Sequence, residues 1–138
     1  MKTKPQTITK AFIIAGLMNL TVLIWSRFFS NKTIAEFDQV VLSNFGLLMI
    51  VVWGIAYIAV AKKFYEVKWL VVVFAIEKFI YGCAWTNWML HNNVSDVFKK
   101  DTMAGIFYAI YGINDWLFFV FFSFVFVYLF NLKKNTLN

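Results

Sequence analysis

The sequence predicts an all-α, polytopic integral membrane protein that folds as a four-helix antiparallel transmembrane bundle with short loops. Two observations lead to this prediction: the composition of the chain and its four long apolar segments. Of the 138 residues, 62% are hydrophobic and 14% are charged, whereas soluble domains carry about 25% charged residues. The segments are too long and too uniformly apolar for membrane strands. The scarcity of Gly (6) and Pro (1) favours uninterrupted helices.

The four apolar segments define a single four-span membrane domain over residues 1–138. The predicted spans are residues 11–29, 40–61, 69–90 and 102–130. At about 1.5 Å per residue, a helix of this length can cross a hydrocarbon core of about 30 Å. Because the connecting loops are short, successive helices should pack as antiparallel neighbours. The basic residues before the first segment are typical of a signal peptide, but no small-x-small cleavage site follows it. We therefore interpret this segment as a retained span.

Lysine and arginine residues are distributed unevenly between the two ends of the bundle, which predicts its orientation. Eight lie on the side of the termini: Lys2, Lys4, Lys10, Lys62, Lys63, Lys68, Lys133 and Lys134. Four lie on the opposite side: Arg27, Lys32, Lys99 and Lys100. Both termini should therefore be cytoplasmic, and the Asn- and Lys-rich composition indicates a bacterial inner membrane. Because the basic residues cluster at the ends of apolar runs, we expect the lipid bilayer and not nucleic acid as their partner.

A weak internal repeat occurs at an offset of 63 residues. Three pairs of distinctive residues coincide: Trp25 with Trp88, Asp38 with Asp101, and Trp53 with Trp116. This pattern suggests that the first two helices and the last two helices are parallel copies of one hairpin, although a few matches in so apolar a chain also arise by chance.

Ionisable residues inside the predicted spans mark a candidate site, because each such charge costs about 2.5–3.5 kcal/mol in hydrocarbon. The third span carries Glu77 and Lys78, and the fourth carries Asp115. In adjacent antiparallel helices these side chains lie at similar depth. The other candidates share helix faces with them or lie near the middle of the first span: Asn19, Tyr81, Trp85, Tyr108, Tyr111 and Asn114. We predict that these residues form a pocket with an acidic floor and aromatic walls.

Two carboxylates and one amine leave one negative charge unmatched at this site. Glu77 and Lys78 are adjacent and point about 100° apart around the helix. Lys78 is therefore better placed to pair with Asp115 across the helix interface, or to extend towards the cytoplasmic interface. The surplus acid should hold a proton or meet a cation. We therefore expect the pocket to bind or carry a hydrophobic or cationic small molecule, or a proton.

Three alternative interpretations remain open. Intramembrane polar residues also hold helices together, at about 0.6 kcal/mol per hydrogen bond. Gly105, Ala109 and Gly112 form a close-packing face, internal or between protomers, which fits a homodimer or an accessory subunit bound to another membrane protein. The two acids could also act as proton donor and acceptor in an intramembrane isomerase. The sequence does not decide whether the protein is an enzyme.

Several other chemistries lack the residues that they need. His91 is the single histidine and Cys83 the single cysteine. These counts exclude a metal site rich in histidine or cysteine, and bis-histidine haem ligation within one chain. No glycine-rich phosphate loop or nucleophile elbow is present. We therefore expect neither a metal nor a cofactor.

The four-span plan, with Glu77 and Asp115 buried among many aromatic residues, resembles the sterol-isomerase and sigma-2-type membrane proteins. Its size and topology resemble the DoxX-type small membrane proteins. No motif of either group can be placed residue by residue in this chain. The resemblance therefore implies a four-span architecture and assigns no activity.

Overall fold

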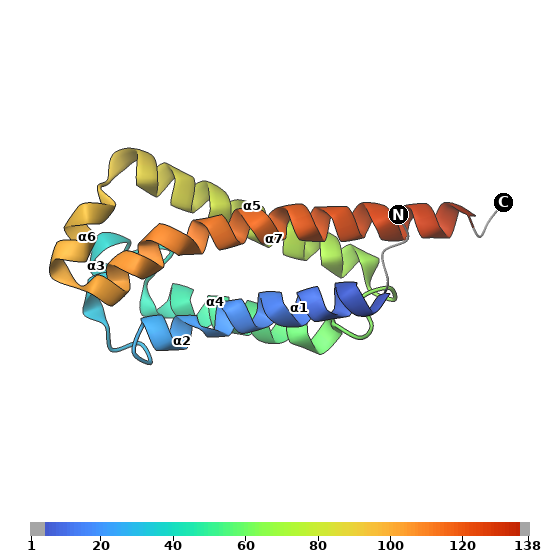
Figure 1. The fold of residues 1–138 in the computed structure, drawn as a ribbon, viewed down its shortest axis with the longest axis horizontal. Coiled ribbons are helices and arrows are strands. Elements are labelled where there is room, and N and C mark those ends of the chain that lie inside the picture. The colour runs from blue at the N-terminus through green and yellow to red at the C-terminus, as the bar shows by residue number, and fades with distance from the viewer. Residues whose placement is uncertain (1–4, 136–138) are drawn as a thin grey trace.

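The computed structural model describes residues 5–135 as an assembly of helices, with no strand in that part of the chain (Figure 1). The long helices are α1 (Pro5–Leu20), α4 (Asn44–Val60), α5 (Lys68–His91) and α7 (Thr102–Asn135). The short helices are α2 (Val22–Trp25), α3 (Lys32–Phe37) and α6 (Val94–Lys100). Lys2 and Lys4, which contribute to the predicted orientation, lie outside the described residues.

The long helices form two antiparallel pairs, α1 with α4 and α5 with α7 (Figure 1). By length and composition, three segments are able to cross a membrane: Pro5–Trp25, which combines α1 and α2, Lys68–His91, and Thr102–Leu132. Helix α4 is apolar but shorter, with 17 residues. The all-helical class predicted from the sequence is therefore confirmed, together with three helices of membrane-spanning length.

The structure corrects the bounds of the first predicted span, residues 11–29. The helix begins earlier, at Pro5, breaks at Thr21 and ends at Trp25. Residues 27–29 then adopt the left-handed conformation, with φ values of 48°, 53° and 67°. Residues with positive φ cannot continue a right-handed helix, whose φ is about −63°, so the chain turns away at this point. Apolar character alone continues through these residues and does not reveal the turn.

The second predicted span, residues 40–61, is also too long at its start. Helix α4 begins at Asn44 because the Ser43 hydroxyl accepts a hydrogen bond from the Gly46 N–H at 3.1 Å, which caps the helix. The third and fourth predicted spans agree closely with α5 and α7, except that α7 continues to Asn135.

The two short helices α3 and α6 are not predicted by hydropathy, because six and seven residues are too few to give a long apolar pattern. Each begins with an asparagine cap. The Asn31 side chain accepts from the Thr33 N–H at 3.2 Å, and the Asn93 side chain accepts from the Ser95 N–H at 2.9 Å. Both helices lie at the end of the molecule opposite the chain termini (Figure 1).

The helix bounds repeat at the 63-residue offset found in the sequence. Shifted by 63, α1 begins where α5 begins, α3 falls within α6, and α4 falls within α7. Ile34 and Val97, which the offset pairs, are both fully buried. Asp38 and Asp101 each follow the short helix in an extended conformation and accept backbone N–H groups. The order of the helices, and several of their bounds, therefore follow the same offset in the two halves of the chain.

The core consists of two hydrophobic clusters with a polar layer between them. The cluster nearer the termini contains Phe12, Tyr57, Phe74 and Phe122. The cluster nearer α3 and α6 contains Val22, Trp88, Val97 and Tyr108. Along α1, α5 and α7, buried polar residues separate the two clusters: Asn19, Glu77, Lys78 and Asp115. The three charged members all lie in the second half of the chain, so this layer does not follow the 63-residue offset.

Candidate functional site

Lys78 is the hub of the polar layer. The residue is 1% exposed, and its Nζ donates to Asp115 Oδ1 at 2.6 Å and to Asn19 Oδ1 at 2.8 Å. The same nitrogen lies 4.0 Å from Glu77 Oε1 and 5.5 Å from the centre of the Tyr57 ring. The pairing of Lys78 with Asp115 across the α5–α7 interface agrees with the charge argument from the sequence. The neighbouring acid is left at the limit of an ion pair.

Glu77 has one satisfied and one unsatisfied oxygen. Its Oε2 accepts a hydrogen bond from the Tyr57 hydroxyl on α4. Its Oε1 has no hydrogen-bond partner among the described residues. The residue is nevertheless buried, with only 6% of its surface exposed. A buried acceptor without a donor costs about 1–3 kcal/mol, and more when it is charged. This oxygen is therefore the atom of the site that most requires a further partner.

Tyr57 is a residue of the candidate site that the sequence analysis missed. It is fully buried and lies on α4, whereas the predicted site draws only on the first, third and fourth spans. One signal was available: Tyr57 is the single tyrosine of the second predicted span. A buried tyrosine hydroxyl requires a partner, and the intramembrane acids are the strongest acceptors in the chain.

Asn19 connects the polar layer to α4 through the backbone. Its side-chain amide donates to the Ile50 carbonyl at 3.0 Å, while its oxygen accepts from Lys78. The close approach of α1 and α4 allows this contact. A Cβ added to Gly54 would lie 2.8 Å from the Asn19 Cβ and from the Gly16 oxygen. The four long helices thus meet in one hydrogen-bonded network.

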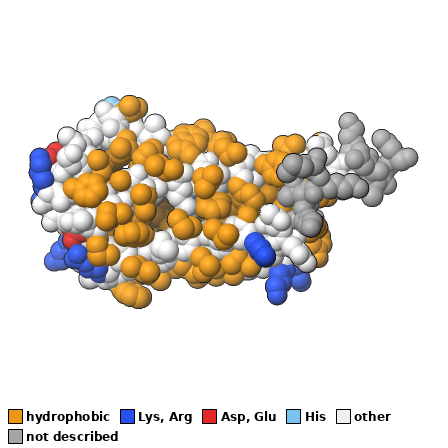
Figure 2. Space-filling model, viewed as in Figure 1, with side chains coloured by type: hydrophobic (Ala, Val, Ile, Leu, Met, Phe, Trp, Pro, Cys, Tyr) orange, Lys and Arg blue, Asp and Glu red, His pale blue; other side chains and the backbone are white. Residues whose placement is uncertain are grey.

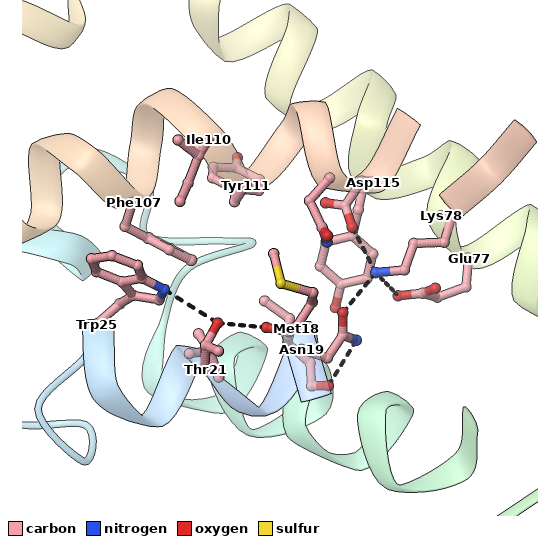
Figure 3. Close-up of a pocket in the computed structure, with 14 residues that line it drawn as sticks. Met18, Asn19, Thr21, Trp25, Glu77, Lys78, Phe107, Ile110, Tyr111 and Asp115 are labelled. Carbon is pink, nitrogen blue, oxygen red and sulfur yellow. Dashed lines mark hydrogen bonds and ion pairs between the residues drawn. The ribbon is translucent and has the colours of Figure 1, made fainter. Parts of the chain in front are cut away.

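A cavity of about 150 Å³ adjoins this network (Figure 3). Seven of the nine predicted site residues line it: Asn19, Glu77, Lys78, Tyr81, Tyr111, Asn114 and Asp115. The lining also includes residues that the sequence analysis did not select: Met18, Thr21, Val22, Trp25, Ile50, Phe107 and Ile110. Most of these are apolar, and nothing in an apolar span distinguishes a cavity wall from a lipid-facing or core position.

A second residue of the cavity lining, Tyr111, has a buried polar atom without a partner. The Tyr111 hydroxyl makes no hydrogen bond within residues 5–135, even though the residue is buried and only 6% exposed. Figure 3 shows Tyr111 on α7 and Glu77 on α5, on either side of Asp115. Two residues that line the cavity therefore each carry a buried oxygen without a hydrogen-bond partner.

Trp85 and Tyr108 do not line the cavity, contrary to the predicted pocket. The Trp85 indole donates to the Tyr108 carbonyl at 2.7 Å, and the Tyr108 hydroxyl donates to the Ile34 carbonyl at 2.7 Å. Trp85 also packs directly over Gly112, where an added Cβ would lie 1.9 Å from the ring. Both aromatic residues hold helices together. Helical periodicity placed them on the correct helix face but could not show that they lie beyond the cavity.

The small residues of α7 pack within the chain. A Cβ added to Gly105 would lie 2.4 Å from the Phe98 ring of α6, just as Trp85 covers Gly112. Both glycines are buried and Ala109 is half-buried. The sequence left open whether this face packs within the chain or between protomers. The structure places the two glycines in contacts within the chain.

The residues described contain no group of three or more His, Cys, Asp or Glu side chains arranged to hold a metal ion. Comparisons of this chain with protein families, characterised proteins and solved structures found no match. The functional argument therefore depends on the geometry of the cavity and its polar wall.

Proposed function

We propose that this protein is a four-helix transmembrane bundle of a bacterial inner membrane, with cytoplasmic termini, whose cavity binds a small, mostly apolar molecule that carries one cationic group. The observation that carries this proposal is that Glu77, which lines the cavity, has a buried Oε1 without a hydrogen-bond partner. An ammonium group there would supply the missing hydrogen bond and balance the second acid, since Lys78 is engaged by Asp115. Charge-assisted hydrogen bonds of this kind are about twice as strong as neutral ones.

The remaining cavity wall suits the apolar body of such a molecule. Tyr81, Tyr111 and Trp25 line the cavity, and aromatic faces attract cations within about 6 Å of the ring centre. Val22, Ile50 and Phe107 complete an apolar lining. Small-molecule sites typically combine such a lining with a few convergent polar groups.

Helix α4 is the fourth span of the proposed bundle. Its 17 residues extend about 26 Å at 1.5 Å per residue, at the lower limit for a transmembrane helix. It pairs with α1, a helix of membrane-spanning length together with α2, and is joined to α5 through the Tyr57–Glu77 hydrogen bond. A helix held between two spans at this depth is most simply a span itself.

The geometry favours a bound molecule over the alternatives. If Glu77 only held a proton, no cavity would be needed beside it. A cavity of about 150 Å³ adjoins Glu77. The accessory-subunit hypothesis drew on the small-residue face, and Phe98 and Trp85 already cover its two glycines. The isomerase hypothesis requires two free acids, but Asp115 is paired with Lys78.

Binding of benzylamine tests this proposal, with benzyl alcohol as its uncharged counterpart. We expect saturable binding of labelled benzylamine to the protein in phosphatidylcholine vesicles. Glu77→Gln should raise the Kd for the amine by about tenfold or more, because it removes a buried charged contact, and should change alcohol binding little. Equal binding of amine and alcohol, or equal amine binding by the Glu77→Gln variant, contradicts the proposal.

A further inference from the structure

The cavity is too small for a whole ligand of ordinary size. Ligand sites commonly measure about 300–1,000 Å³, whereas this cavity measures about 150 Å³. An engineered cavity of about 150 Å³ accommodates a molecule the size of benzene. The space beside Glu77 and Tyr111 therefore suits a head group, and any longer part of a ligand must extend out of the cavity.

The cavity reaches the protein surface between α1 and α7. Met18 on α1 and Ile110 on α7 both line it, and they are 41% and 39% exposed. Figure 3 shows Met18 beside Asn19 on α1, and Ile110 on the opposing helix α7. We call the gap between Met18 and Ile110 the lateral mouth.

The lateral mouth opens onto an apolar face of the molecule. On the face shown in Figure 2, where α1 and α7 lie in front, hydrophobic side chains cover the middle, and the charged side chains gather at the two ends. Met18 precedes the end of α2 at Trp25 by seven residues, or about 10 Å. Ile110 follows the start of α7 at Thr102 by eight residues, or about 12 Å. The mouth thus lies within hydrocarbon depth, in the leaflet on the side of α3 and α6.

We infer that the ligand is a single-chain lipophilic amine that enters sideways from this leaflet, with its amine at Glu77 and its hydrocarbon chain lying through the lateral mouth into the bilayer. This inference rests on the proposed function and specifies its ligand class and route. A solute taken from water would have to cross the lipid to reach the mouth. An ethanolamine phospholipid is a poor fit, because its phosphate would lie beside Glu77 and Asp115 and exceed the cavity.

Met18 and Ile110 border the lateral mouth, and we call their substitutions the lip variants. These variants distinguish the contribution of the ligand's hydrocarbon chain to binding from that of its head group. In Met18→Trp and Ile110→Trp the indole should cover the opening and leave the interior free. At equilibrium both variants should bind decylamine about tenfold or more weakly than wild type, because the chain must occupy the mouth in the bound state. Benzylamine has no chain to place in the mouth, so the same variants should weaken its binding less than they weaken that of decylamine. Ile113→Trp is the matched control, since Ile113 lies on the same helix, is 61% exposed and does not line the cavity.

The outcomes distinguish this inference from the proposed function. Wild type should bind both amines in phosphatidylcholine vesicles, and added phosphatidylethanolamine should not compete. Benzylamine binding without decylamine binding, or equal weakening of both amines by the lip variants, overturns the lateral route and leaves the proposed function intact. Decylamine binding that is unaffected by either lip variant, or is equally weakened by Ile113→Trp, also overturns it. Competition by phosphatidylethanolamine overturns the single-chain assignment. If neither amine binds, the proposed function fails as well.

Discussion

The Lys78 ammonium lies 2.6 Å from Asp115 Oδ1, on the neighbouring helix. Its distance to the carboxylate beside it in sequence, Glu77 Oε1, is 4.0 Å. Consecutive residues diverge by about 100° around a helix, so the ammonium of Lys78 reaches across the helix interface more easily than back to its neighbour. The pairing therefore leaves Glu77 Oε1 at the limit of an ion pair and without a hydrogen bond, and this makes the cavity chemically distinctive.

Lys78→Met should destabilise the protein strongly. The substitution keeps the apolar bulk of the side chain but leaves two buried acids without a cation, and breaking a buried ion pair costs about 3–5 kcal/mol. The measurement is the free energy of unfolding in mixed micelles titrated with denaturing detergent. Adding Asp115→Asn to the same chain should recover a large part of the loss. A Lys78→Met variant as stable as wild type would show that the pair does not hold α5 to α7.

Tyr57→Phe should lower the free energy of unfolding by about 1–3 kcal/mol, because Glu77 Oε2 loses its donor. The same change at the exposed Tyr65 is the control and should have little effect. A double-mutant cycle of Tyr57→Phe with Glu77→Gln should give a coupling of about 0.5–3 kcal/mol. Strict additivity of the two changes would contradict the hydrogen bond.

The fold was predictable from hydropathy to the extent that helices follow long apolar runs. The third and fourth predicted spans agree with α5 and α7. The first predicted span continues beyond the end of its helix at Trp25, and the second begins before its helix starts at Asn44. There the chain turns through local contacts, such as the Ser43 cap and the left-handed residues 27–29, which apolar character does not report. Hydropathy also misses α3 and α6, because their stability depends on caps and on one buried residue each.

The polar layer of the site was predictable because charges in an apolar span are rare and must meet one another. This reasoning finds Glu77, Lys78, Asp115 and Asn19. It does not find Tyr57, because a tyrosine is equally common as a packing residue. The apolar lining, including Met18 and Ile110, depends on how tightly α1 approaches α7, a tertiary distance that no local pattern encodes.

Gly112→Ala should destabilise the protein, although alanine favours helices more than glycine by about 1 kcal/mol. The added methyl group would lie 1.9 Å from the Trp85 ring, and overpacking of this kind costs about 1–3 kcal/mol. Thermal unfolding in detergent measures the effect. Replacing Trp85 by Phe in the Gly112→Ala chain should recover part of the loss. A stabilised Gly112→Ala variant would show that α5 and α7 do not approach this closely.

The loop between α6 and α7 should make stability depend on pH through Asp101. The Ala104 backbone N–H, donating at 2.8 Å, is the main cause that holds the pKa of Asp101 below its ordinary value, with Asn31 and Arg27 adding to it. A lowered folded-state pKa stabilises the protein above the unfolded value of about 3.9. This contribution is lost as the pH falls through the folded-state pKa.

Unfolding measured as a function of pH checks this expectation. Below about pH 4, wild type should lose more stability than the Asp101→Asn variant, which has no carboxyl group to titrate. Asp96→Asn is the control, since Asp96 is exposed and pairs only with Lys99 three residues on. Asp96→Asn could reduce the loss of stability at low pH as much as Asp101→Asn does. In that case the hydrogen bond from Ala104 to Asp101 does not cause the pH dependence.

A crystal structure of the protein grown with decylamine that carries a terminal bromine is the most direct test of the central claim. We predict that the amine nitrogen lies within hydrogen-bonding distance of Glu77 Oε1, and that the anomalous signal of bromine lies outside the cavity, beyond Met18 and Ile110. An empty cavity, or an amine bound away from Glu77, would contradict the account.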